Sequence, residues 1–181
     1  GIPTCIPALF AIGVLKENDD DDDFIDDVDV LLASKNLVYI VNTGGTPSAS
    51  QTGQLLATQS FQSGRSVLLI DQKLPLTDDS EIQKEISGVH ITHSEGIFDA
   101  SSGSGDSSFF RSINFETKIK ALLSSYDQVI ICSDNQKSNA GLIAVKPFDP
   151  ALVILTRLRK TKKEIIKNIM SLHPITVLFY G

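Results

Sequence analysis

The sequence contains few cysteines. Among its 181 residues only Cys5 and Cys132 carry thiols, and they lie far apart with no CxxC pair. A disulfide framework or a zinc knuckle needs several closely spaced cysteines, so this scarcity excludes both. We therefore expect a reducing, cytoplasmic setting and no metal site.

Basic residues and long apolar segments are also scarce. The chain has 16 lysines and arginines against 22 acidic residues, a formal net charge of -6, which disfavours nucleic acid as a partner. The apolar opening is too short to span a bilayer, is interrupted by Pro3 and Pro7, and lacks the basic flank of a signal peptide. We expect contact with a membrane only through segments outside this chain.

Negative charge is concentrated in one stretch. Residues Glu17 to Asp29 hold nine of the 22 acidic side chains. Five consecutive aspartates repel one another, and the stretch lacks the interleaved glycine of a calcium loop, so we expect a solvated linker. A short amphipathic helix is predicted next, from apolar residues at helical spacing between Phe24 and Leu32. This lead-in, 1–36, precedes one domain, 37–181.

Apolar runs alternate with helical patterns through the rest of the chain. Continuous apolar runs are typical of strands covered on both faces, and their alternation with helices predicts a doubly wound, mostly parallel α/β sheet. Strands are predicted at Leu37–Val41, Ser66–Asp71, Gly88–Thr92, Gln128–Cys132, Ala151–Thr156 and Ile175–Tyr180. Helices are predicted at Gln51–Ser63, Glu81–Ser87, Phe115–Ser124, Asn139–Lys146 and Lys162–Leu172.

The segment between the first of these strands and the first helix, "NTGGTPSASQ", stands where a phosphate-binding loop would stand, yet it has no lysine. Backbone N–H groups around Gly44, Gly45, Ser48 and Ser50 could face an anion at the helix N-terminus. The alternative is a plain strand-to-helix turn in which Ser50 caps the helix.

Two other residue groups do not support a catalytic or metal site. His90 and His93 are three apart, a spacing that on a strand would point them to opposite faces, so we expect no shared metal site. Ser133 and Asp134 lack the glycine pattern of a nucleophile elbow. We predict no catalytic residues from either group.

Several segments together resemble a known family. They are "LVYIVNTGGTPSASQTGQLLATQSFQSGRSVLLIDQKLP", "YDQVIIC" and "ALVILTRLRKTKKEIIKNIM". In order and spacing they resemble the cytoplasmic domain of bacterial tyrosine kinases of exopolysaccharide chain-length regulators, relatives of the ParA and MinD ATPases. The resemblance covers Leu37 to Gly181 and implies a P-loop NTPase-like three-layer sandwich.

The chain departs from the family pattern at its nucleotide motifs. Aligned from the helix side, Ala49 takes the place of the phosphate-loop lysine, Ser50 that of the magnesium-ligating hydroxyl, and Gln51 that of the next hydroxyl. Asp71 keeps the first aspartate of the second motif, but Lys73 replaces its partner. Cys132 replaces the aspartate of the third motif, and Asp134 follows two residues later.

These changes affect phosphate neutralisation and magnesium binding together, and phosphoryl transfer depends on both. We therefore predict a non-catalytic, pseudokinase-like domain that uses no cofactor and acts by association with itself or with polysaccharide export or polymerisation proteins. The alternative is an active ATPase or protein-tyrosine kinase with an atypical phosphate loop and weakly bound Mg-ATP. The resemblance also implies that the full-length protein is anchored in the bacterial inner membrane.

Overall fold

A computed structural model describes residues 10–14, 32–43, 48–71, 84–86, 88–92, 114–133, 140–156, 164 and 176–180. For 10–14, 84–86, 92, 156 and 176–180 the description is limited to the backbone. The acidic run lies outside these residues, as do most of the helices predicted up to Leu32 and over Lys162–Leu172. Those predictions stay untested.

The molecule is built on one eight-stranded sheet with the order β1-β8-β7-β2-β6-β3-β5-β4. All neighbouring strands are parallel except β4 and β5, which pair antiparallel at one edge. The strands are β1 (Phe10–Val14), β2 (Leu37–Asn42), β3 (Val67–Asp71), β4 (Lys84–Ile86), β5 (Val89–Thr92), β6 (Gln128–Ser133), β7 (Ala151–Thr156) and β8 (Thr176–Tyr180).

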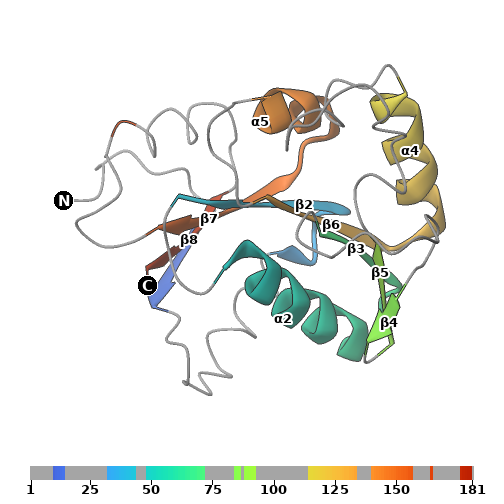
Figure 1. Ribbon diagram of the computed structural model, residues 1–181, viewed down its shortest axis with the longest axis horizontal. Helices are drawn as coiled ribbons and strands as arrows, with labels where there is room; N and C mark the ends of the chain where they lie inside the picture. The colour runs from blue at the N-terminus through green and yellow to red at the C-terminus, as the bar shows by residue number, and fades with distance from the viewer. Residues whose placement is uncertain are drawn as a thin grey trace.

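Helices cover both faces of the sheet. Figure 1 shows α2 (Ala49–Gln62) beneath the strands, and α4 (Phe115–Ser125) and α5 (Ala140–Val145) on the other side. A 3-10 turn, η2 (Lys146–Phe148), continues α5 toward β7. The prediction of a doubly wound, three-layer α/β sandwich is therefore confirmed.

Two apolar cores separate these layers. Leu56 and Ala57 of α2 pack with Ile40, Leu69 and Ile130 on one face of the sheet. On the other face Ile119 of α4 and Leu142 of α5 pack with a second set of strand residues. Strands β2, β3 and β6 send alternate side chains into both cores, which explains their continuous apolar sequences.

The helix predicted at Glu81–Ser87 is wrong, because Lys84–Ile86 form the edge strand β4. Gly88, at φ 84°, makes the tight turn that lets β4 pair antiparallel with β5. A seven-residue helix is marginal in water, whereas pairing along β5 satisfies backbone groups. Strand β1 was not predicted at all, and it lies within the lead-in 1–36.

The C-terminus of α2 leads into β3 through a compact turn. Arg65 N–H bonds Ser60 O and Gly64 N–H bonds Phe61 O, the Schellman arrangement, with Gly64 at φ 91°. Next, Ser66 and Asp127 bond reciprocally: Ser66 N–H donates to Asp127 Oδ2 at 2.8 Å, and Asp127 N–H donates to Ser66 Oγ at 2.9 Å. This pair joins the segments that enter β3 and β6, which are neighbours in the sheet.

Candidate functional site

The carboxyl ends of three adjacent strands meet at one edge of the sheet, where α/β folds bind their ligands. Strand β2 leads to Thr43, β3 ends at Asp71 and β6 ends at Ser133. Thr43 is fixed to the next strand, since its N–H and Oγ1 both donate to Leu155 O, at 2.7 and 2.8 Å. The start of α2 lies over this edge through the contact of Ser50 with Asp71.

Helix α2 begins with a capping box. Ser48 is the N-cap: its Oγ accepts from Gln51 N–H at 3.2 Å, while Gln51 Oε1 accepts from Ser48 N–H at 3.0 Å. The prediction that Ser50 caps this helix is therefore wrong by two residues. The S-x-x-Q spacing is the sequence signature of a capping box and could have identified Ser48.

Ser50 lies in the first turn of α2 and reaches down to the sheet. Its Oγ donates a hydrogen bond to Oδ2 of Asp71, a residue that is 1% exposed. A buried carboxylate needs hydrogen-bond donors, and this hydroxyl supplies one of them. The structure thus brings together two predicted site residues that are 21 positions apart in sequence.

Cys132 lies beside Asp71 on the same face of the sheet. The two residues are register partners on β6 and β3, and Ile40 of β2 is the partner on the other side. The thiol is buried under α2 at Gly53, where an added Cβ would stand 2.1 Å from Cys132 Sγ. A free, buried thiol therefore packs directly against the helix backbone at the end of β6.

Ala49 completes the part of the predicted site that the structure describes. Its methyl group is fully buried at the base of α2 and belongs to the apolar core beneath that helix. Of the predicted loop and strand-end residues that the structure describes, Asp71 therefore supplies a carboxylate, and Ser48 and Ser50 supply hydroxyls. Gly44, Gly45, Lys73 and Asp134 lie outside the described residues.

The described part of the chain holds no group of three or more His, Cys, Asp or Glu side chains that could bind a metal ion. In the same ranges, no helix is both long and apolar enough to cross a membrane.

Ser133 points to the opposite face of the sheet from Cys132. It hydrogen-bonds Tyr39, whose pKa is raised to about 12 because burial disfavours the phenolate more than this hydrogen bond favours it. The phenol therefore stays neutral at physiological pH. Ser133 is engaged in this buried pair with Tyr39.

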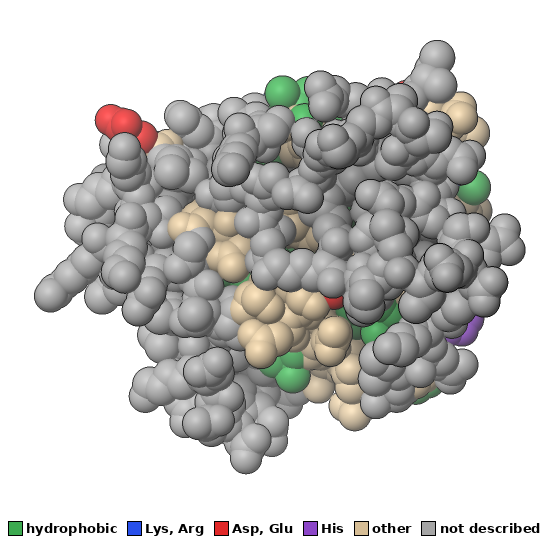
Figure 2. All heavy atoms as spheres, in the orientation of Figure 1, with side chains coloured by type: hydrophobic (Ala, Val, Ile, Leu, Met, Phe, Trp, Pro, Cys, Tyr) green, Lys and Arg blue, Asp and Glu red, His purple; other side chains and the backbone are tan. Residues whose placement is uncertain are grey.

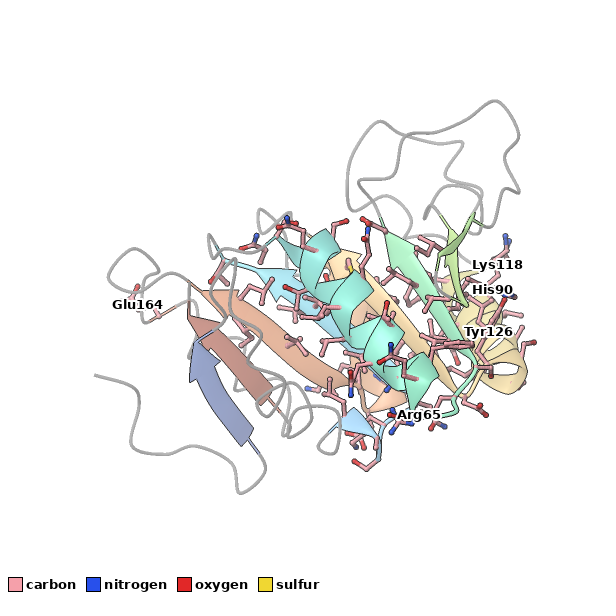
Figure 3. All side chains as sticks on the ribbon, turned by 90° about the horizontal axis from the view of Figure 1, so that it is seen from below. Arg65, His90, Lys118, Tyr126 and Glu164 are labelled. Carbon is pink, nitrogen blue, oxygen red and sulfur yellow. The ribbon has the colours of Figure 1, made fainter. Side chains whose placement is uncertain are left out.

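Sequence patterns gave no signal for the contact between His90 and Tyr126. His90 Nδ1 lies 2.9 Å from Tyr126 Oη, and the two rings meet edge to face at 5.7 Å. Figure 3 shows both at the β5 side of the sheet, away from the start of α2. His93 lies outside the described residues. The His90 contact joins β5 to the segment that follows α4.

No protein-family model and no curated protein matches the sequence. Solved structures do match. The BceF tyrosine kinase domain aligns with a TM-score of 0.67 at 14% identity, covering 92% of this chain and 80% of that chain. The kinase domain of the Escherichia coli tyrosine kinase ETK aligns with a TM-score of 0.65 at 12% identity, covering 96% and 90%.

A more distant match is cobyrinic acid a,c-diamide synthase from Mycobacterium smegmatis, solved with ADP and magnesium. It aligns with a TM-score of 0.51 at 13% identity over 80% of this chain and 72% of that chain. The chain has the fold of bacterial tyrosine kinase domains. The resemblance drawn from the sequence is thus confirmed at the level of the fold.

Proposed function

We propose that this chain is a non-catalytic, tyrosine-kinase-like domain that acts through protein association in exopolysaccharide biosynthesis, chain-length control or export. The observation that carries the proposal is the start of α2. There the buried Ala49 takes the place of the phosphate-loop lysine of the family pattern, and Ser48 and Gln51 cap the helix N-terminus. The shared fold supports the family context, and the side chains at this edge support the loss of catalysis.

Charge is the first argument for a lost nucleotide site. Phosphoryl transfer needs cations that neutralise the β and γ phosphates and carboxylates that hold magnesium. Ala49 brings a buried methyl group and Cys132 a buried thiol to two of these positions. If a nucleotide bound at this edge, the negative charge of its phosphates would not be neutralised, because the lysine and the carboxylate-bound magnesium of the family pattern are missing.

Occupied backbone donors are the second argument. Phosphate loops bind anions through N–H groups at the helix N-terminus. In this chain the N–H groups of Ser48 and Gln51 are both bonded within the capping box. An incoming phosphate would have to displace these bonds, which stabilise the helix by about 1 kcal/mol.

One observation favours the alternative of an active nucleotide site. Ser50 Oγ and Asp71 Oδ2 are already in contact, and a hydroxyl with a nearby carboxylate is the pair that holds magnesium in P-loop enzymes. This alternative requires the missing positive charge to come from another residue, and Lys73 is the candidate near the end of β3.

Titration calorimetry with Mg-ATP and an assay of ATP turnover and tyrosine phosphorylation test the proposal. We expect no turnover and a dissociation constant weaker than about 1 mM, or about -4 kcal/mol. Binding in the low micromolar range, or phosphorylation by the unmodified chain, would refute the proposal.

The combined variant Ala49→Lys, Lys73→Asp and Cys132→Asp tests whether the scaffold itself still fits a nucleotide. If the rest of the site is intact, this variant recovers measurable Mg-ATP binding. Ile143→Lys is the matched control, because it adds a lysine at a side chain 63% exposed on α5, across the sheet. It should recover no binding.

A further inference from the structure

The two edges of the sheet are attached to their chain in different ways. At one edge, only two residues separate Ile86 of β4 from Val89 of β5, and Gly88 makes the turn between them. Strand β4 is therefore held on its own β5. At the other edge β1 pairs with β8, while β2, the strand that follows it in sequence, lies three places away in the sheet. The pairing of β1 is thus not fixed by a short connection.

Strand β1 is held at its edge mainly by one neighbour. Five register pairs join it to β8, from Phe10 with Thr176 to Val14 with Tyr180. Among the described elements, no helix packs on β1 to a comparable extent. Figure 1 shows β1 and β8 at one end of the sheet and α2 beneath its middle, where the described side chains form the tan and green surface of Figure 2. Replacing β1 by an identical strand therefore breaks and re-forms its contacts with β8, the main contacts that the structure describes for it.

The connection from β1 to β2 is long enough to leave open which copy's β8 receives β1. It comprises 22 residues, 15–36. Continuing the registers across the sheet places Val14 level with Thr43, so the connection returns over six residues to Leu37 and crosses three strand spacings. These correspond to about 20 Å and about 14 Å, or about 24 Å in a straight line. Because 22 extended residues span up to about 75 Å, the same connection can reach a neighbouring molecule.

The strand that fits the outer edge of β8 is known, because it is β1 itself. A second copy offers the same residues in the same register, so the contacts made within one chain and between two chains are alike. Such an exchange of identical elements is a low-cost route to dimers. When two copies exchange β1 reciprocally, both β8 edges are covered and the assembly closes about a two-fold axis.

We propose that β1 is an exchangeable strand, which pairs with β8 of its own chain in dilute solution and with β8 of a second copy when copies are concentrated. This inference rests on the proposed function, because it names the element through which the domain associates. A solvated linker of 22 residues has a root-mean-square length of about 26 Å, close to the span of about 24 Å, so it holds β1 at its own β8 at an effective concentration on the order of 1 mM. Exchange therefore competes near this concentration, or where copies are held side by side.

Cysteine cross-linking in the full chain tests the exchange. In a Cys5→Ser background, Ala11→Cys and Val177→Cys are mixed as two separate variants. The two positions are register partners, so their Cα atoms lie about 5 Å apart, within disulfide range. Neither variant can form this disulfide within one chain. The yield of the mixed disulfide after a brief oxidation, measured by mass spectrometry of the linked peptides, should rise at least about tenfold between about 10 μM and about 1 mM.

The other edge of the sheet supplies the matched control. Glu85 and His90 are register partners on β4 and β5. A mixture of Glu85→Cys and His90→Cys should give no mixed disulfide, because the turn at Gly88 keeps this pair within one chain. The double variant of Ala11→Cys and Val177→Cys should close its disulfide within the chain at about 1 μM, which checks the pairing itself.

A shortened connection should shift the pairing toward exchange. Deleting residues 15–31 leaves five residues before β2, whose reach of about 20 Å is less than the span of about 24 Å. The shortened chain should therefore be dimeric at about 10 μM in analytical ultracentrifugation, whereas a chain that lacks residues 1–31, and with them β1, should be monomeric. Circular dichroism checks that each variant is folded.

Three results overturn this inference: a mixture that cross-links no more than the control pair, a double variant that closes no internal disulfide, or a shortened chain that is folded and monomeric. If the shortened chain does not fold, cross-linking of the full chain decides. The same samples are assayed for Mg-ATP turnover. Turnover with exchange would refute the proposed function alone, whereas no turnover and no exchange would refute the exchange of β1 alone.

Discussion

At the scale of single residues, Gly53 and Cys132 determine how closely α2 approaches the sheet. The helix backbone lies so near the thiol that an added Cβ would stand 2.1 Å from Cys132 Sγ and 3.0 Å from Leu69 Cδ1. Both neighbours are buried and neither is the end of a long flexible side chain. The identities of positions 53 and 132 are thus coupled by packing.

Replacing Gly53 tests this coupling. Gly53→Ala should lower the free energy of unfolding by about 1–2 kcal/mol, because the overpacking cost exceeds the helix-propensity gain of alanine. In a Cys132→Ala background the sulfur is gone, so Gly53→Ala should be neutral or stabilising. Urea denaturation of all four proteins gives the coupling energy. If the stability changes of the two single variants add up to that of the double variant, then Cys132 is not the residue that prevents a larger side chain at position 53.

The contact between Ser50 and Asp71 gives a second prediction. Ser50→Ala removes a hydroxyl donor from a buried carboxylate, so we expect a loss of about 1–3 kcal/mol in the free energy of unfolding at pH 7. Ser124→Ala is the control, because it removes an exposed hydroxyl that bonds Lys120 O on α4. The control should change stability by less than about 0.5 kcal/mol. Equal effects from both variants would contradict a structural role for the Ser50 contact.

At the scale of elements, the sequence predicted the buried strands well and the edges of the sheet poorly. The run Gln128–Cys132 is continuously apolar after its first residue because β6 is covered on both faces, and the structure confirms it as a strand. Strands β1 and β4 lie at the two edges, where each has one neighbour: β1 pairs with β8, far away in the sequence, and β4 pairs with β5 across the turn at Gly88. Local patterns carry no information about the pairing of β1 with so distant a strand, and the short run Lys84–Ile86 has no alternating pattern that would identify it as a strand.

Prediction of the candidate site had the same limit, because contacts between elements that are distant in sequence could not be predicted. The sequence placed Asp71 and Cys132 at strand ends, and the structure confirms that they are neighbours. It did not indicate that Cys132 packs under Gly53, since this contact depends on how deeply α2 sits on the sheet. The capping residue was missed for another reason: the Ser48 to Gln51 signature was present, but Ser50 was preferred as the cap.

The Ser66–Asp127 pair that joins the entries to β3 and β6 predicts a pH dependence. Hydrogen bonds from Ser66, with Arg65 nearby, lower the pKa of the Asp127 carboxyl. When the pKa of a carboxyl is lower in the folded state than in the unfolded state, its charge stabilises the protein at every pH above the unfolded-state pKa of about 4. This stabilisation is lost as the pH falls through the folded-state pKa. Asp127→Asn keeps an acceptor but loses the charge.

The stability difference between the wild-type chain and Asp127→Asn should therefore be constant between pH 7 and 5 and should shrink below about pH 4. Urea denaturation across this range measures it. Glu116→Gln is a comparison variant in an exposed ion pair on α4, where Lys120 lowers the pKa of Glu116. The stability difference between the wild-type chain and this variant should also shrink at low pH. A difference that grows on acidification would contradict the assignment.

At the scale of the whole molecule, the sheet and its two covering layers form one body, and the acidic run lies outside the residues that the structure describes. Deleting Asp19 to Asp23 should leave the melting temperature nearly unchanged at moderate salt, because mutually repelling, solvated charges contribute no folding stability. Calorimetry of the deletion and of a variant with five asparagines in their place measures this. A large decrease in the melting temperature of the deletion variant would refute the linker interpretation, and so would strong stabilisation of the intact chain by calcium.

The pairing of β1 with β8 has a consequence for biosynthesis. Phe10 lies opposite Thr176, so the first of the described strands meets the partner that the structure gives it only after the last of them has been translated. Ribosomes add about 5–20 residues per second, which leaves the segment Phe10–Val14 waiting on the order of ten seconds or more. During that interval an apolar strand with unpaired backbone groups is available to other nascent chains. Among the described strands, the one made first is therefore among the last to be protected.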